Sequence, residues 1–213
     1  MKGRDFHLAK LIKRRIFAVE NRIVFRMGKH VYLRPILKED LPLMTIWIND
    51  PEVTQFLLVS HPMSHVDEEA WLEDLHKRKE TNVGVAIVLV ETNEIIGTMG
   101  LHGIDHRNRR ATTGSVIGRK ALWNKGYGTE AKMLLLGYAF NTLNLRKVCS
   151  AVLDFNGRSM KALAKCGYRP EGVLKEHIFR NGRYADEHLF AIFREDFLPL
   201  WEKFRKEVLG QVD

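Results

Sequence analysis

Hydrophobic and polar positions recur along the chain with two periods, and the period predicts the type of each element. In the first half, alternating or β-branched apolar runs predict strands over 22–26, 31–34, 83–90, 95–101 and 111–118. Helical spacing of apolar residues predicts a helix over 38–48 and a second from Ser64 to about Lys79, where Ser64 and Asp67 resemble a capping box. The last three strands follow one another closely, so we expect an antiparallel meander.

The second half continues with alternating helices and strands. A helix ending near Asn144, a strand over 146–153 and a helix over 156–165 are followed by Gly167, which suits a left-handed cap. Two strands over 168–179 and 184–193 flank Asn181-Gly182, a strong hairpin signal, and a last amphipathic helix follows. This order predicts an α/β fold of the α+β three-layer type with a mixed sheet. We expect one domain over 27–213, preceded by an extension over 1–26 with a ragged helical pattern.

The stretch from Trp123 to Ala131 combines a strand before it, two glycines and a helix after it. The first N–H groups of a helix lack partners and carry partial positive charge, and glycine lets a phosphate approach the backbone. Lys125 could add a point charge. The stretch lacks the Gly-Lys-Ser/Thr of a nucleotide P-loop and is a poor dinucleotide fingerprint. On these residues alone, an anion site and ordinary turn chemistry remain equal alternatives.

Length, composition and cysteine usage narrow the class of protein. The chain has 213 residues and no apolar run long enough to span a membrane, and charges interrupt any signal-peptide core. Two cysteines, Cys149 and Cys166, form neither a secreted disulfide framework nor a zinc site. We therefore expect a reduced, cytoplasmic protein without a metal.

Positive charge is concentrated at the N-terminus. Residues 1–30 hold nine Lys or Arg residues against Asp5 and Glu20, so most of the net charge of +8 lies there. Such an arm could contact a ribosome, a nucleic acid or another anionic surface, or it could be a solvated or self-docked extension. The pattern leaves these alternatives open.

Taken in order, several short motifs resemble the GNAT superfamily of acyl-CoA-dependent N-acyltransferases, and most closely its ribosomal-protein N-terminal and spermidine acetyltransferases. The motifs lie between Val31 and Phe197; they are Val31–Pro35, Trp47–Val53, Ile96–Ile104, Trp123–Ala131, Asn156-x-x-Ser159, Gly167–Gly172 and Asn181–Asp186. The resemblance implies a mostly antiparallel central sheet with splayed middle strands and helices on both faces. It also implies acetyl-CoA as co-substrate.

By the same resemblance, the glycine turn holds the pyrophosphate of acetyl-CoA and the strand before it pairs with the pantetheine arm. The implied cofactor-binding residues are Val116, Ile117, Gly118, Trp123, Asn124, Lys125, Gly126, Tyr127, Gly128, Thr129, Asn156 and Ser159. Asn156 also suits a helix N-cap. Ser159 is the candidate for the group that faces the departing sulfur.

The general base is less well defined. Many relatives carry a glutamate where Thr112 stands and a tyrosine where Leu163 stands, so neither group is available here. Glu176 and His177 are the candidate bases, His102 is a further one, and Glu52 could hold a cationic substrate. An exposed strand or loop position is the simpler explanation for each of them. Asp186 matches a family position, but a hairpin salt bridge with Arg183 explains it equally well.

Together these observations predict an acetyl-CoA-dependent N-acetyltransferase that acts on a primary amine. The preferred acceptor is a protein N-terminal α-amine, with a polyamine or another small amine as the alternative. A catalytically weak acyl-CoA-binding module is the alternative from another class, and a nucleic-acid-binding protein is poorly supported. The sequence does not choose between a monomer and a homodimer.

Overall fold

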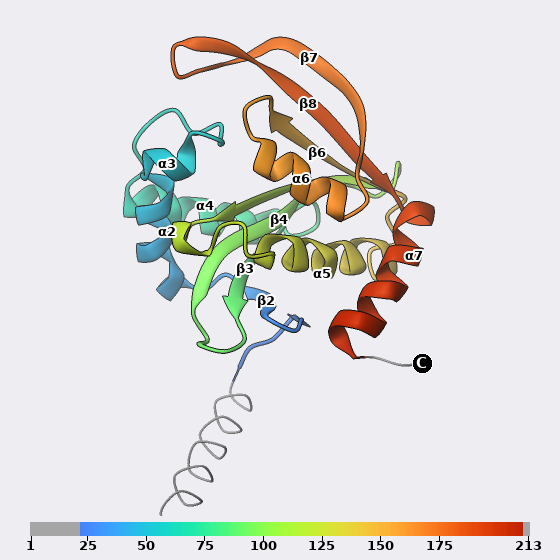
Figure 1. The fold of residues 1–213 in the computed structure, drawn as a ribbon. Coiled ribbons are helices and arrows are strands. Elements are labelled where there is room, and N and C mark those ends of the chain that lie inside the picture. Colours follow the sequence, from blue (N-terminus) through green and yellow to red (C-terminus); the bar gives the residue numbers. More distant parts are fainter. Residues whose placement is uncertain (1–21, 211–213) are drawn as a thin grey trace, which may run out of the picture.

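The computed structural model describes residues 22–210, so the predicted N-terminal helix lies outside the described part of the chain. Its centre is an eight-stranded sheet in the order β1-β2-β3-β4-β5-β6-β8-β7 (Figure 1). The strands are β1 Arg26–Met27, β2 Val31–Pro35, β3 Val83–Leu89, β4 Ile95–Asp105, β5 Arg110–Ile117, β6 Lys147–Leu153, β7 Arg169–Arg180 and β8 Arg183–Phe193. The helices are α2 Leu41–Ile48, α3 Pro51–Thr54, α4 His65–Lys77, α5 Tyr127–Asn141, α6 Gly157–Lys165 and α7 Arg194–Phe204, with short helical turns at Lys38–Asp40, Lys120–Leu122 and Arg205–Leu209.

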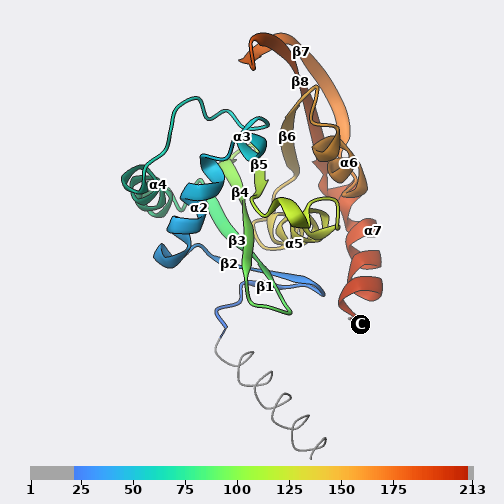
Figure 2. The same ribbon diagram turned by 60° about the vertical axis from the view of Figure 1, so that its left-hand side comes forward.

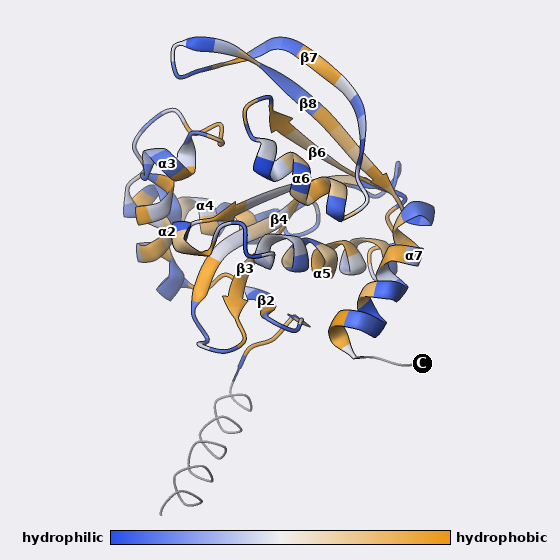
Figure 3. Ribbon diagram, viewed as in Figure 1, coloured by the Kyte–Doolittle hydropathy of each residue, from blue (hydrophilic) through white to orange (hydrophobic). Residues whose placement is uncertain are grey.

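The sheet is covered on both faces. Helices α2 and α4 lie on one side, and α5, α6 and α7 lie on the other (Figure 2). Two apolar clusters match these layers: one joins Leu41, Met44 and Trp47 of α2 to one face, and the other joins α5 and α7 to the opposite face. Apolar residues accordingly concentrate on α5 and the inner strands, whereas the outer end of the β7–β8 hairpin is largely hydrophilic (Figure 3).

The pairing of β5 with β6 is the one parallel contact in the described sheet, and it is short. Only Arg110, Ala111 and Thr112 pair with β6, opposite Lys147, Val148 and Cys149. Beyond Thr112, β5 keeps its antiparallel partner β4 on one edge, while its other edge leaves β6. The predicted splay of the middle strands is therefore confirmed, and it opens a gap in the sheet.

The predicted fold class and element order are confirmed. The antiparallel meander is present as β3, β4 and β5, the capping box joins Ser64 and Asp67 at the start of α4, and Gly167 follows α6 with φ +88°. The short helix α3 was missed because its four residues are too few for a periodic signal. No helix within 22–210 is long and apolar enough to cross a membrane.

Candidate active site

A cleft of about 580 Å³ lies where β5 and β6 diverge, bounded also by α3, α5 and α6. Ten residues that the sequence predicts for cofactor binding line it: Val116, Ile117, Trp123, Asn124, Gly126, Tyr127, Gly128, Thr129, Asn156 and Ser159. Segments far apart in the chain thus meet at the gap in the sheet. Such a concave site at a break in a sheet is a common position for a ligand.

One end of the cleft is built to receive an anion. Helix α5 begins after Gly126 without a side-chain cap, so the N–H groups of its first turn have no side-chain acceptor. Gly126 has φ +88° and Asn124 has φ 62°, so the turn repeatedly enters the left-handed region. Turns of this kind point successive backbone N–H groups into one concavity. Together with the helix dipole, they give this end of the cleft an affinity for phosphate.

The open edge of β5 supplies backbone groups along the cleft. The hydroxyl of Ser150 donates to the Thr113 carbonyl at 3.3 Å, and the indole Nε1 of Trp123 donates to the Ile117 carbonyl at 2.7 Å. Both carbonyls therefore point away from β4. Because backbone direction alternates with period two in a strand, the N–H and C=O of Ser115 point the same way. An extended amide-bearing ligand could pair with this edge as a strand would.

Gly118 and Lys125 are outside the lining of the cleft. A Cβ at Gly118 would lie 1.9 Å from the Trp47 ring, so this glycine allows α2 to pack against the end of β5. Lys125 is exposed on the outer side of the turn. Their roles in cofactor binding stay predictions.

The start of α6 forms the wall opposite the glycine turn. Asn156 accepts a hydrogen bond from the Ser159 backbone N–H at 3.1 Å, which confirms the predicted N-cap. Ser159 lines the cleft with its neighbour Arg158. The Arg158 guanidinium carbon lies 3.7 Å from the Trp123 ring centroid and 5.2 Å from that of Phe56.

Lys132 on α5 also lines the cleft, and it is a buried amine with a relative exposure of 6%. Within residues 22–210 its ammonium makes no hydrogen bond and no ion pair. Burial lowers the pKa of Lys132 to about 8, with a small opposing effect from Cys166. A partly neutral amine in the cleft can exchange a proton near neutral pH.

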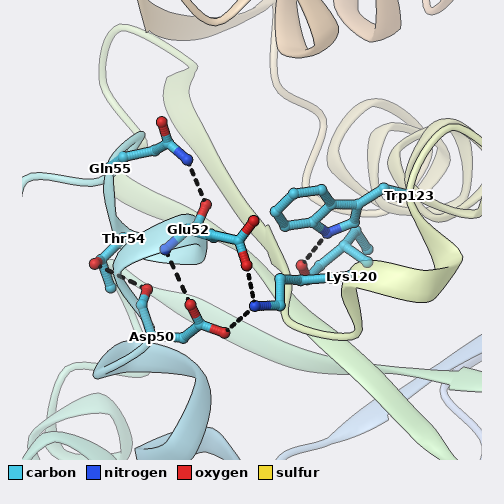
Figure 4. Close-up of polar contacts among 7 residues, drawn as sticks. Asp50, Glu52, Thr54, Gln55, Lys120 and Trp123 are labelled. Carbon is cyan, nitrogen blue, oxygen red and sulfur yellow. Dashed lines mark hydrogen bonds and ion pairs between the residues drawn. The ribbon is translucent and has the colours of Figure 1, made fainter.

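The outer opening of the cleft lies beside α3, whose carboxylates are already paired. Lys120 contacts Asp50 at 2.8 Å and also contacts Glu52, so it holds both acidic groups together (Figure 4). These contacts lower the pKa of Asp50 and raise that of Lys120. Glu52, a candidate for holding a cationic substrate, is thus engaged by a cation of the chain itself.

Glu176 and His177 lie on the edge strand β7, outside the lining of the cleft. Glu176 has φ 48° where the β7–β8 register shifts, and His177 Nε2 lies 3.9 Å from Glu187 Oε2. Asp186 accepts from Lys175 at 2.7 Å and from the Glu176 N–H at 2.9 Å. The expected partner Arg183 instead approaches Asp154 at 3.5 Å. The assignment of Glu176 and His177 as bases stays a prediction.

His102 lies nearer the divergence of the strands. A Cβ built on Gly114, which lines the cleft, would lie 3.2 Å from His102 Nε2. The residue as a whole is exposed, yet desolvation of its ring lowers the pKa of His102, and the charge of Lys132 adds to this effect. The imidazole is therefore mostly neutral at pH 7 and able to accept a proton.

Comparison with known proteins agrees with this geometry. The profile of the acetyltransferase (GNAT) domain matches residues 30–169. The chain belongs to the GNAT acetyltransferase family. The uncharacterized N-acetyltransferase p20 of Bacillus licheniformis is 31% identical over 169 residues, which cover 78% of this chain and 93% of that protein. This GNAT protein is therefore an acetyl-CoA-dependent N-acetyltransferase.

Solved structures share the GNAT fold. The spermidine N-acetyltransferase of Vibrio cholerae, in complex with CoA and spermine, superposes with a TM-score of 0.74 at 24% identity, over 79% of this chain and 98% of that one. RimJ of Mycobacterium smegmatis, in complex with CoA-disulfide, gives a TM-score of 0.73 at 21% identity, over 83% and 88%. At these identities the structures establish the fold of this GNAT domain and leave its acceptor open.

Several polar residues that line the cleft were missed in the sequence, among them Lys132 and Arg158. Residues 131–137 of α5 are all buried, so the helix is apolar almost all round, and a lysine within such a run must be buried too. That signal was available. No sequence signal places Arg158 on Trp123, because the contact joins two helices across the cleft.

Proposed function

We propose that this acetyltransferase transfers the acetyl group of acetyl-CoA to the α-amine of a protein N-terminus. The observation that carries the choice of acceptor is that the carboxylates beside α3, Asp50 and Glu52, are both paired with Lys120. They are engaged by a cation of the chain, and within the described residues no carboxylate lines the cleft to hold a polyamine. An N-terminal α-amine brings one charge and ionises with a pKa of ~8, so part of it is neutral near pH 7.

The residues present fit acetyl-CoA. The uncapped start of α5 would hold the pyrophosphate, and the open edge of β5 around Ser115 would pair with the pantetheine amides. From Ile117 to Thr113 this edge is about 13 Å long, at ~3.3 Å per residue, which suits an extended arm. Acetyl-CoA supplies the activated acyl group, and the residues of the cleft would hold that group in position.

The acceptor would enter between α3 and the β7–β8 hairpin. Arg180 donates to the carbonyls of Thr54, at 3.0 Å, and Leu57, and so ties the hairpin to the segment after α3. Near this opening the rings of Phe56 and Phe155 lie 5.9 Å apart, and Arg183 lies 5.3 Å from the Phe155 ring. The guanidinium of Arg183 can donate hydrogen bonds to the carbonyls of a peptide, whereas it would repel a polycation.

Two residues would assist the chemistry. His102 is the base in this proposal: it is outside the lining of the cleft, but its neutral ring lies beside Gly114, which lines it. It would accept a proton from the attacking amine, directly or through water. Ser159 would donate a hydrogen bond to the sulfur of the thioester as the C–S bond lengthens.

A panel of acceptors tests the proposal. Peptides with a free N-terminus, the same peptides with a blocked N-terminus and an internal lysine, spermidine and an aminoglycoside would be compared by mass spectrometry and thiol release. We expect acetylation of the free α-amines, with kcat/KM at least tenfold above that for spermidine. Preferential acetylation of spermidine would overturn the choice of acceptor. Tight CoA binding without thiol release from any acceptor would support the binding-module alternative.

A further inference from the structure

The buried amine of Lys132 has no task in the mechanism so far. It belongs to α5, the helix whose first turn would hold the phosphates, and it lines the cleft while remaining almost fully buried. Taking an ammonium out of water costs several kcal/mol unless a partner compensates for the lost hydration. Within 22–210 it has no carboxylate partner, so only water or a ligand in the cleft can compensate for this cost.

Lys132 lines the cleft from α5 and interacts with groups of two other segments. Its charge influences the pKa of Cys166, whose thiol lies 3.7 Å from the Thr129 carbonyl, and the pKa of His102. His102 lies beside Gly114, two residues beyond the last pair of β5 with β6 at Thr112. The amine is therefore near the place where the strands part, which is where the arm of an acyl-CoA held at the glycine turn would end.

The sulfur that leaves acetyl-CoA must be neutralised at that end. A serine hydroxyl can donate a hydrogen bond to a thiolate, but it does not titrate near neutral pH, so Ser159 cannot be the net source of the proton. Leu163, one turn after Ser159 on α6, has an apolar side chain and cannot supply a proton. The titratable groups that interact with Lys132 are Cys166 and His102. The basic residues of α6 that line the same cleft are Arg158, Lys161 and Lys165. The buried hydroxyl of Tyr168 lies 3.1 Å from Oγ1 of the cleft residue Thr113, and burial raises the pKa of this phenol.

We propose that Lys132 is the acid of the reaction: its ammonium stabilises the departing thiolate and protonates it. This inference rests on the proposed binding of acetyl-CoA in the cleft. Lys132 acts from α5, while Ser159 orients the sulfur from α6, so the two helices that border the cleft act on one atom.

The step is balanced in atoms and charge. The neutral acceptor amine forms a C–N bond with the acyl carbon and gives one proton to His102 or to water. The C–S bond breaks with its electron pair going to sulfur, and Lys132 transfers one proton to that sulfur and becomes a neutral amine. Lys132 regains a proton from solvent and His102 returns its proton to solvent as free CoA leaves. The sum is amine plus thioester giving amide plus thiol.

The acidity of the group suits this step. The lowered pKa of Lys132, about 8, is close to the ~8.5 of an ordinary alkyl thiol, so transfer between them is nearly isoenergetic. An unperturbed lysine has a pKa roughly two units above that of the thiol, so it would be a poorer proton donor. Efficient acid catalysis requires such a match, and it contributes typically 10²-fold or more.

The direct test is the pKa of the CoA thiol in the complex, which requires no acceptor. Thiolate absorbance of the CoA complex would be titrated against pH, with the desulfo-CoA complex as the blank that removes the signal of Cys149 and Cys166. We expect the bound thiol to have a pKa at least one unit lower in the wild type than in Lys132→Met. Lys203→Met is the matched control, because Lys203 is exposed on α7, outside the cleft, and it should leave the thiol titration unchanged. Equal thiol pKa values in wild type and Lys132→Met would overturn the proposal.

Kinetics separate this inference from the proposed function. Lys132→Met should lower kcat ~10²-fold with little change in KM for acetyl-CoA, and the high-pH limb of the kcat profile, set by deprotonation of Lys132, should disappear. A variant that loses CoA affinity but keeps the thiol pKa would make Lys132 a binding cation and refute its role as acid, with the proposed function intact. If the wild type bound no CoA, both proposals would fail.

Discussion

Arg158 lies with its guanidinium carbon 3.7 Å from the centroid of the Trp123 ring, so the start of α6 stacks on the turn that precedes α5. The same indole donates to the Ile117 carbonyl at the end of β5. One aromatic ring thus connects both walls of the cleft. Desolvation in this position lowers the pKa of Arg158, but its ordinary value is so high that it stays charged.

Replacing Arg158 by alanine should therefore weaken CoA binding. Arg158 lines the cleft, and loss of one charge-assisted contact with the anionic ligand costs about 1.5–3 kcal/mol, which corresponds to a roughly 10- to 150-fold rise in Kd. Arg158→Lys should restore little, because an ammonium cannot stack on the indole as a planar guanidinium does. Arg183→Ala is the control: Arg183 lies over Phe155, outside the lining of the cleft. Calorimetric titration with CoA measures all three, and equal affinities in Arg158→Ala and Arg183→Ala would contradict the prediction.

Gly126 and Gly182 offer a matched pair for testing the anion site. They have φ +88° and +78°, and a Cβ on either would meet nothing within 4 Å in the chain. Valine at either position should cost ~1–2 kcal/mol of stability through left-handed strain. Gly126→Val should in addition abolish CoA binding, because the side chain enters the path of the phosphate, whereas Gly182→Val should bind normally. Thermal unfolding and titration together measure both effects; normal CoA affinity in Gly126→Val would remove the turn from the site.

Ser159→Ala should lower kcat by about tenfold and leave the Kd of CoA nearly unchanged. The physical reason is that its hydroxyl would act only as the C–S bond breaks, so its loss affects the transition state more than the ground state. Asn156→Ala provides the contrast: it removes the N-cap of α6, costs ~1 kcal/mol of stability and displaces Ser159 and Arg158 together. Unchanged turnover in Ser159→Ala would show that water or Lys132 acts on the sulfur without it.

The sequence was sufficient for most of the fold because its local signals agree with the final packing. The glycine turn before α5, the Asn156 cap and the Asn181-Gly182 hairpin each have a backbone geometry that their residues prefer. The splay of β5 from β6 was expected through the resemblance to a family. Strand order was harder to predict. Strand β8 lies between β6 and β7, and this order places Glu176 and His177 at the edge of the sheet.

The chemistry of the cleft was less accessible from the sequence. A lysine in a helix usually faces water, and Lys132 was overlooked although the apolar residues around it in α5 indicate a buried position. Glu52 was a candidate for binding a cation until Lys120, distant in sequence, was found beside it. The contact of Glu52 joins remote segments, which no periodic pattern records, whereas the burial of Lys132 follows from the pattern of its own helix.

Lys120→Met should broaden the range of acceptors. The variant leaves Asp50 and Glu52 without their cation near the opening of the cleft, so they become free to attract a positively charged amine. We expect kcat/KM for spermidine to rise several-fold at low salt and the gain to fall with ionic strength, while CoA affinity stays the same. Lys38→Met, a change of the same charge at an exposed position, is the control. If kcat/KM for spermidine is the same in the wild type and in Lys120→Met, acceptors do not pass these carboxylates.

The buried amine of Lys132 should also make stability depend on pH in a definite direction. Its pKa is about 8 in the folded protein and 10.5 when unperturbed, so below about pH 8 both states are protonated and the folded state carries the full cost of burying the charge. Between these values the folded state loses its proton first, and stability rises with pH by about 1.4 kcal/mol per unit. Above 10.5 both states are neutral and the rise ends.

Lys132→Met removes this dependence while keeping a side chain of similar length. At pH 7 the variant should be more stable than the wild type by up to about 3 kcal/mol, and the difference should shrink towards pH 10.5. Urea unfolding of both proteins at several pH values measures the difference, and subtraction cancels the other groups that titrate in this range. A difference that does not vary with pH would mean that the amine is solvated in the folded protein. A variant that is both more stable and slower would show that the chain keeps a destabilising charge in the cleft for its chemistry.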